Sequence, residues 1–232
     1  MRTLQTFATN HWQLLCLTLL ITLLWNTNVL LPLRILTVFL HELSHALAAI
    51  VTGGKVLRLS ISPNEGGLVT TRGGSPFWIT SAGYLGSLLI GALLFVLALR
   101  TNWDRAILAM FGILTLLVAA FYVRDLFAFG FTLATGAAML LSSRFLSVEI
   151  NDMILRTIGV SSMIYAPLDI FDDTIRRAHL RSDARILAEQ VGGSTMLWGG
   201  LWLLISVAVI AITLRYGLPQ NSNITLPRQG KT

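Results

Sequence analysis

The sequence predicts an all-α, multi-pass membrane protein with about seven transmembrane helices and a small β-hairpin after the second helix. Of its 232 residues, 54% are hydrophobic and 12% are charged, about half the charged share of an ordinary soluble domain. The apolar residues gather in long runs, and a helix needs about 20 such residues to span a bilayer. The basic residues are scattered between these runs, so the net charge of +6 indicates membrane orientation rather than nucleic-acid binding.

The first two helices are predicted from apolar runs near the N-terminus. The run 14–25, extended back through Trp12, is followed by no small-residue cleavage site, so it predicts an uncleaved first helix rather than a signal peptide. Pro32 suits the first turn of the second helix. The glycine pair 53–54 is typical of a helix end.

A change of period follows the second helix. Leu57, Leu59 and Ile61 alternate with their neighbours, and 63–67 has the composition of a turn. We therefore expect a β-hairpin within residues 55–75. One hypothesis is that its edge accepts an extended peptide by strand addition; an ordinary interfacial loop is the alternative.

The remaining helices follow from five further runs, at 77–99, 106–123, 126–141, 153–175 and 196–214. The third helix begins with small residues at 81–86, which let transmembrane helices approach closely. We expect one domain over residues 1–217, with a charged loop at 174–193 and a disordered tail at 218–232. The single Cys16 excludes an intramolecular disulfide and a cysteine-based metal cluster.

The candidate chemistry lies in the second helix, at His41-Glu42-Leu43-Ser44-His45. Positions i and i+4 share one face of a helix, so His41 and His45 can bind one metal ion together. Glu42 then lies beside the metal and can act as a general base. Each histidine taken alone could be a hydrogen-bonded core residue. Ionisable groups within a lipid-spanning helix usually mark a functional site, however, which favours the metal interpretation.

Two histidines leave a catalytic zinc ion one protein ligand short, and an acidic side chain is a usual third ligand. The sixth run contains Asp169, which follows Pro167-Leu168 and lies among apolar neighbours. Proline is expected to kink or break the helix there. We therefore expect Asp169 to be the third ligand.

Three rivals for the third ligand stay open: Asp172, Asp173 and His179. The two aspartates are expected to cap the helix end or to pair with Arg176 and Arg177. His179 lies in an arginine-rich stretch and is expected to be a solvated loop residue.

Topology relates these residues to the two sides of the membrane. With seven spans, the ends of the second and sixth helices emerge on one side, so His45 and Asp169 lie at similar depth. That side also holds the N-terminus and has the larger share of lysine and arginine outside the spans. The positive-inside rule therefore places the N-terminus and the metal site toward the cytoplasm. We expect a bacterial inner (plasma) membrane, or an organelle membrane of bacterial descent.

The segment Phe39-Leu40-His41-Glu42-Leu43-Ser44-His45-Ala46, with Gly53-Gly54-Lys55-Val56, resembles the site-2 protease family of intramembrane zinc metallopeptidases. The similarity is to the compact peptidase-like branch of bacteria and plants. Residues 81–86 resemble the second motif of that branch, and Pro167-Leu168-Asp169 resembles the family's third motif. The sequence departs from the family in three ways: Ile170 replaces a glycine, an asparagine near the second motif is absent, and no peptide-binding domain is inserted.

The resemblance implies a zinc-dependent endopeptidase that cleaves membrane-embedded substrates with a metal-activated water. His41, His45 and Asp169 would bind Zn²⁺, and Glu42 would be the catalytic base. The expected partners are a transmembrane or membrane-associated protein substrate and the lipid bilayer; no nucleic acid is expected, and the oligomeric state is open. The alternatives are a non-catalytic pseudo-protease that acts as a scaffold or regulator and, less favoured, a small transporter built around the broken sixth helix.

Overall fold

The computed structural model describes residues 2–224. Its elements are α1 (Arg2–Leu24), α2 (Leu31–Val51), β1 (Lys55–Ile61), β2 (Gly67–Arg72), α3 (Pro76–Arg100), α4 (Asp104–Tyr122), α5 (Leu126–Phe145), α6 (Val148–Phe171), a π-helical turn η1 (Asp172–Arg176), α7 (Asp183–Val191) and α8 (Thr195–Gly217). Within this part of the chain, 7 helices are long and apolar enough to cross a membrane. The predicted class, a multi-pass helical membrane protein with a hairpin after the second helix, is confirmed.

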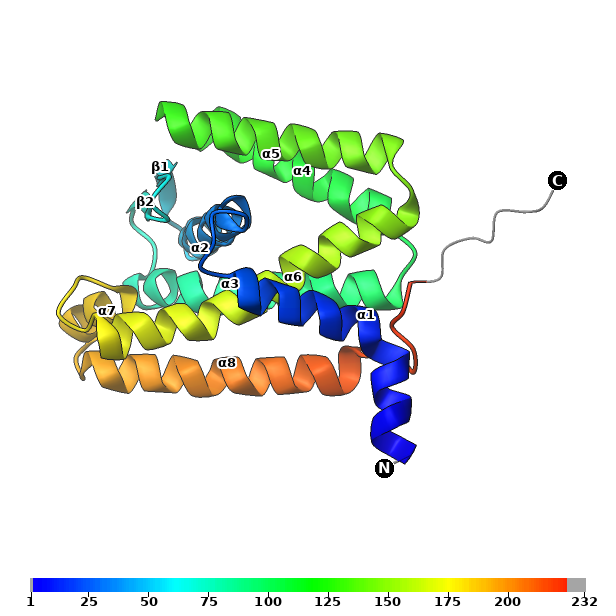
Figure 1. The fold of residues 1–232 in the computed structure, drawn as a ribbon. Coiled ribbons are helices and arrows are strands. Elements are labelled where there is room, and N and C mark those ends of the chain that lie inside the picture. The colour runs from blue at the N-terminus through cyan, green and yellow to red at the C-terminus, as the bar shows by residue number, and fades with distance from the viewer. Residues whose placement is uncertain (1, 225–232) are drawn as a thin grey trace.

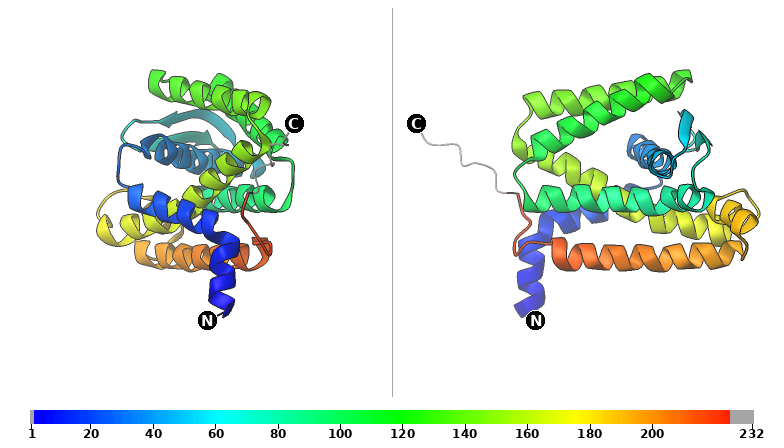
Figure 2. Two further views of the ribbon diagram at one scale, coloured as in Figure 1. Left: turned by 45° about the vertical axis from the view of Figure 1, so that its right-hand side comes forward. Right: turned by 180° about the vertical axis from the view of Figure 1, so that it is seen from behind.

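Helix α2 occupies the middle of the molecule. Helices α3, α6 and α8 run side by side, and α4 and α5 form an antiparallel pair on the other side of α2 (Figure 1). Helix α2 lies across these helices, being seen end-on in Figure 1 and lengthwise in the left view of Figure 2. Residues 34–46 of α2 are all buried. A helix that is apolar and buried on every side belongs to the core of a large assembly of helices.

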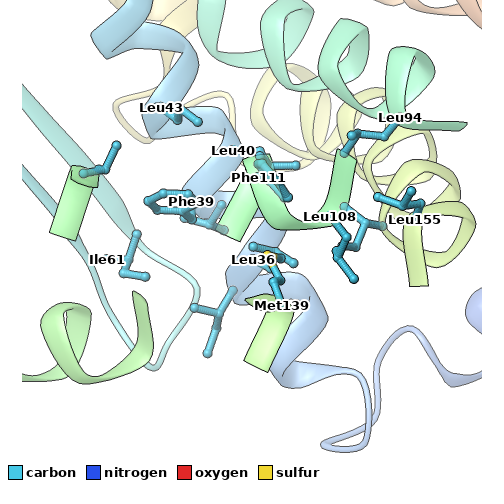
Figure 3. Close-up of a cluster of buried hydrophobic side chains, with 14 of the residues drawn as sticks. Leu36, Phe39, Leu40, Leu43, Ile61, Leu94, Leu108, Phe111, Met139 and Leu155 are labelled. Carbon is cyan, nitrogen blue, oxygen red and sulfur yellow. The ribbon is translucent and has the colours of Figure 1, made fainter. Parts of the chain in front are cut away.

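The main hydrophobic core surrounds this central helix (Figure 3). Leu36, Phe39, Leu40 and Leu43 of α2 pack in one cluster with side chains of five other elements, namely Ile61, Leu94, Leu108, Phe111, Met139 and Leu155. Phe39 and Leu40 are fully excluded from solvent. The metal motif begins one residue after Leu40, so the core fixes the backbone that carries it.

Small residues allow α3 and α6 to pack backbone to backbone. A Cβ on Gly91 would lie 2.5 Å from the Ser162 Cβ and 3.1 Å from the Gly159 carbonyl oxygen. The Ser162 hydroxyl donates to the Ser87 carbonyl oxygen at 2.8 Å. The close packing predicted for the small residues of the third helix is therefore confirmed.

Strands β1 and β2 form a two-stranded antiparallel sheet in which Leu59 pairs with Val69. A turn joins them, and the Ser62 N–H donates to the Gly66 carbonyl oxygen at 2.8 Å. Both strands contact α2. The hairpin thus packs directly against the helix that carries the metal motif.

Helix α6 differs from the predicted sixth helix. Pro167 lies inside it without ending it, and the helix continues to Phe171 and then widens into η1. Proline removes one backbone N–H donor but fixes a helical φ angle. In place of the expected break, the helix has a wider turn that begins five residues later.

The two ends of the described chain lie together, at the end of the molecule away from the hairpin and α7 (Figure 1). The Ser222 N–H donates to the Asn10 carbonyl oxygen at 3.0 Å, and the Ser222 hydroxyl lies 2.8 Å from Nδ1 of His11. The sequence predicts an N-terminus on the same side of the membrane as the metal site, and this stays a prediction; in the structure α2 lies across the other helices (Figure 1). Residues 218–224 of the predicted disordered tail hold defined contacts; 225–232 lie outside the described residues.

Candidate metal centre

The motif residues of α2 form a compact group of potential ligands. One ligand atom from each of His41, Glu42 and His45 lies within 4.8 Å of the others, and all three residues are buried. The two imidazole rings meet edge to face with centroids 4.7 Å apart. One helical turn thus brings the histidines together, as their spacing predicts.

A backbone carbonyl of α3 orients His45. Nδ1 of His45 lies 2.6 Å from the Ile79 carbonyl oxygen. A carbonyl accepts only, so Nδ1 carries the proton and Nε2 is the nitrogen free to bind a metal ion. Hydrogen bonding of the second ring nitrogen is typical of metal-binding histidines.

Asp183, the first residue of α7, provides the third group at this point. Its Oδ2 atom lies 2.9 Å from His41 Nε2 and 3.2 Å from His45 Nε2. The Ser182 hydroxyl caps α7 by accepting from the Arg185 N–H at 3.4 Å, which fixes the start of the helix. Burial would raise the pKa of the Asp183 carboxyl, but the facing imidazoles outweigh burial and hold this pKa below its ordinary value.

The distances from Asp183 to the two imidazoles are compatible with a shared zinc ion. Zinc–nitrogen and zinc–oxygen bonds of about 2.0–2.1 Å in a tetrahedron place neighbouring ligand atoms about 3.3 Å apart, close to the spacing of Asp183 from both imidazoles. Because Nδ1 of His45 holds the proton, its Nε2 presents a lone pair to the Asp183 carboxylate. Two such electron-rich groups at this distance require a cation between them. A metal ion or a second proton meets that requirement.

Asp169, the expected third ligand, is directed at other partners. Its Oδ2 atom accepts from the Tyr165 hydroxyl at 2.7 Å, and Oδ1 lies 3.3 Å from Nη2 of Arg177. Arg177 also pairs with Asp173 at 3.0 Å. Asp169 lines the same cavity as the histidines, so its role as ligand stays a prediction.

The rivals to Asp169 are also placed. Asp172 pairs with Arg176 at 3.1 Å, and Asp173 accepts from the Tyr84 hydroxyl besides its pair with Arg177. The predicted pairing of both aspartates with arginines is therefore confirmed. His179 is exposed, as expected for a solvated loop residue.

Glycines give the motif side chains their space. A Cβ on Gly83 of α3 would overlap Nε2 of His41 and lie 2.6 Å from Cε1 of His45. A Cβ on Gly67, at the start of β2, would overlap the Glu42 carboxylate. The backbones of α3 and of the hairpin thus both lie directly against the side chains of His41, Glu42 and His45.

A cavity of about 990 Å³ opens onto these groups. Its lining includes His41, Glu42, His45 and Asp183, residues 66–69 of the hairpin and the acidic residues of α6 and η1. A space of this size is within the range of ligand-binding clefts. The candidate metal ligands are therefore reached from an open space rather than sealed in the core.

Comparison with known proteins adds a family match. Residues 14–213 match the family model described as Peptidase M50B-like. Searches among curated proteins and among solved structures found no match. The matched range contains the motif of α2, the hairpin and Asp183.

Proposed function

Since the chain belongs to the Peptidase M50B-like family of site-2 protease metallopeptidases, we propose that it is a zinc-dependent endopeptidase that cleaves membrane-embedded protein substrates. The observation that carries the proposal is the convergence of His41 Nε2, His45 Nε2 and Asp183 Oδ2 beside Glu42 at one cavity. A core histidine pair without function does not require a third, acidic residue from a distant helix.

His41, His45 and Asp183 would hold the zinc ion. When bound, zinc activates a water molecule and polarises the scissile carbonyl. Asp183 is proposed as the third ligand because its carboxylate faces both imidazoles, whereas the Asp169 carboxylate is engaged by Tyr165 and Arg177. Asp169 remains the competing proposal.

Glu42 would do the proton transfers. Its carboxylate lies within 4.8 Å of the histidine ligand atoms, so it can accept a proton from the attacking water and deliver it to the leaving amine. Gly67 packs against this carboxylate and restricts its movement. Holding a base in position near the reacting atoms is a large part of its catalytic effect.

The outer edge of β2 is the proposed docking place for the substrate. In the described sheet β2 pairs with β1 alone, and Gly67, Val69 and Thr71 line the cavity. An extended peptide can add to a free strand edge through backbone hydrogen bonds. A helical substrate must unwind first, and these bonds would offset the loss of its own.

Cleavage of reconstituted substrates tests this function. The purified protein in liposomes is expected to cleave a transmembrane peptide that contains helix-breaking residues at least about tenfold faster than a matched, stable helix, because unwinding costs about 1 kcal/mol per glycine-to-alanine difference. Products are identified by mass spectrometry, with chelator-treated protein as the control. Equal rates for both peptides would contradict docking as a strand, and no cleavage of any peptide would favour the pseudo-protease.

We further propose that the metal site faces the cytoplasm, in a bacterial inner membrane or an organelle membrane of bacterial descent. The loops at that end carry the larger share of basic residues in the described chain, at Lys55, Arg58, Arg72, Arg124, Arg176, Arg177, Arg181 and Arg185. A cysteine at Asn64 should therefore be protected from a membrane-impermeant thiol reagent in intact cells. Labelling of this cysteine in intact cells would show that the metal site faces the opposite side of the membrane.

A further inference from the structure

Arg34, in the first turn of α2, joins three separate segments. Its guanidinium pairs with the Glu65 carboxylate through two bonds, Nε to Oε2 and Nη2 to Oε1, both 2.8 Å long. Its remaining nitrogen, Nη1, donates to the carbonyl oxygens of Trp25 and Thr27 after α1. The arginine side chain is 10% exposed. One buried side chain thus ties the tip of the hairpin to α2 and to the turn that precedes it.

Glu65 occupies a backbone conformation that glutamate rarely adopts. Its φ angle is +62°, and no other non-glycine residue in the described chain has a positive φ. This region favours glycine or asparagine, and two glycines follow at 66–67. Such a conformation persists where other interactions compensate for it, and the two hydrogen bonds to Arg34 contribute to that compensation. The bonds of the carboxylate to Arg34 thus add to the hydrogen bonds of the turn, where the Glu65 N–H donates to the Ser62 carbonyl oxygen at 3.2 Å.

The tip leads directly into the part of β2 that faces the proposed catalytic base. Only Gly66 separates Glu65 from Gly67, whose backbone packs against the Glu42 carboxylate. Arg34, Glu65 and residues 66–69 line the same cavity as the metal-binding atoms. A shift of the tip would consequently shift the edge of β2 along Glu42.

We infer that Arg34 and Glu65 are positioning residues that hold the edge of β2 in register with Glu42 and so set where an extended substrate binds. The inference rests on the proposed function, because the register matters only when a peptide pairs with β2. Neither residue touches the metal-binding atoms. Loss of the pair frees the tip, and the substrate must then order β2 as it binds. This cost weakens substrate binding more than it slows cleavage of the bound peptide.

The chain offers a matched control on the other strand. Arg58 of β1 lies 3.7 Å from Asp125, at the start of α5, and its side chain is 51% exposed. This pair also joins the hairpin to a helix, but neither residue lines the cavity. Exposed pairs of this kind contribute little to stability. Arg58→Gln should therefore leave the register of β2 unchanged.

The experiment compares Glu65→Asn, Arg34→Lys and Arg58→Gln in the full-length, zinc-loaded protein. Asparagine tolerates a positive φ but cannot form the two bonds to Arg34, and lysine keeps the charge but lacks the planar fork. Both variants are expected to raise KM for a reconstituted peptide substrate by about tenfold or more, with kcat changed less than about threefold and zinc content unchanged. Arg58→Gln is expected to match the wild type.

A second measurement reads the tip without substrate or cleavage. Spin labels are placed at Asn64 and at Val29, both exposed, in a background with Cys16 replaced by serine. The distance between them is expected to have a narrow distribution in the wild type and a broad one in Glu65→Asn. Equal widths would overturn the inference, as would a broad distribution with unchanged KM. If the wild type cleaves nothing, the proposed function fails, while the distance distributions still decide whether Arg34 and Glu65 hold the tip.

Discussion

Glu42→Gln is expected to slow cleavage by about three orders of magnitude while zinc content stays unchanged. Glutamine has nearly the shape of glutamate and fits the same space against Gly67, but its amide cannot take a proton from water. General acid–base catalysis contributes about 10²–10⁴-fold, so kcat should fall by about a thousandfold. The measurement is single-turnover cleavage of a reconstituted peptide, together with elemental analysis of the same sample.

A neighbouring substitution controls for packing. Ser44→Ala lies in the same turn of α2 and is equally buried, and the Ser44 hydroxyl donates to the Leu40 carbonyl oxygen rather than facing the cavity. This variant should retain the wild-type rate within a few-fold. Cleavage by Glu42→Gln at the wild-type rate would remove Glu42 from the mechanism. If cells that carry Glu42→Gln behave like the wild type, the pseudo-protease alternative is supported.

Asp183→Ala should lose zinc, and Asp169→Ala should keep it. Removal of Asp183 leaves two imidazoles without the carboxylate that faces both of them, and a catalytic zinc site needs three protein ligands. Removal of Asp169 breaks its bonds to Tyr165 and Arg177, groups that surround the site. Loss of such surrounding contacts typically weakens metal binding by about 10–100-fold, less than loss of a ligand.

Zinc titration against a competing chelator separates these two variants. If Asp169→Ala loses more zinc affinity than Asp183→Ala, then Asp169 is the third ligand, as the sequence predicts. In that case α6 must move to bring Asp169 to the histidines. His179→Ala, at an exposed position, serves as the control and should bind zinc like the wild type.

Local patterns predicted most of the fold. Apolar runs located the seven long helices, and most helix ends were predicted to within a few residues. The change of period after Val51 located the hairpin. These signals are carried by consecutive residues. The crossing of α2 over its neighbours is not local, since it depends on packing around residues 34–46. The sequence therefore predicted the elements but not the way α2 crosses them.

The candidate site divides in the same way. His41, Glu42 and His45 were predicted because one turn of helix brings them together. Asp183 was missed because the contact depends on the turn between η1 and α7, which no helical spacing encodes. Two signals pointed to it: a serine followed by an aspartate is a typical helix start, and Ala184 and Leu187 provide a buried face.

Zinc content tests the central claim most directly. The wild-type protein, purified in detergent without chelators and measured by elemental analysis, should contain close to one zinc ion per chain. His41→Ala should contain almost none after the same preparation, because it removes a ligand from the centre of the site. A wild-type protein that binds no zinc even when zinc is resupplied would contradict the metallopeptidase account and leave a membrane scaffold built on the same fold.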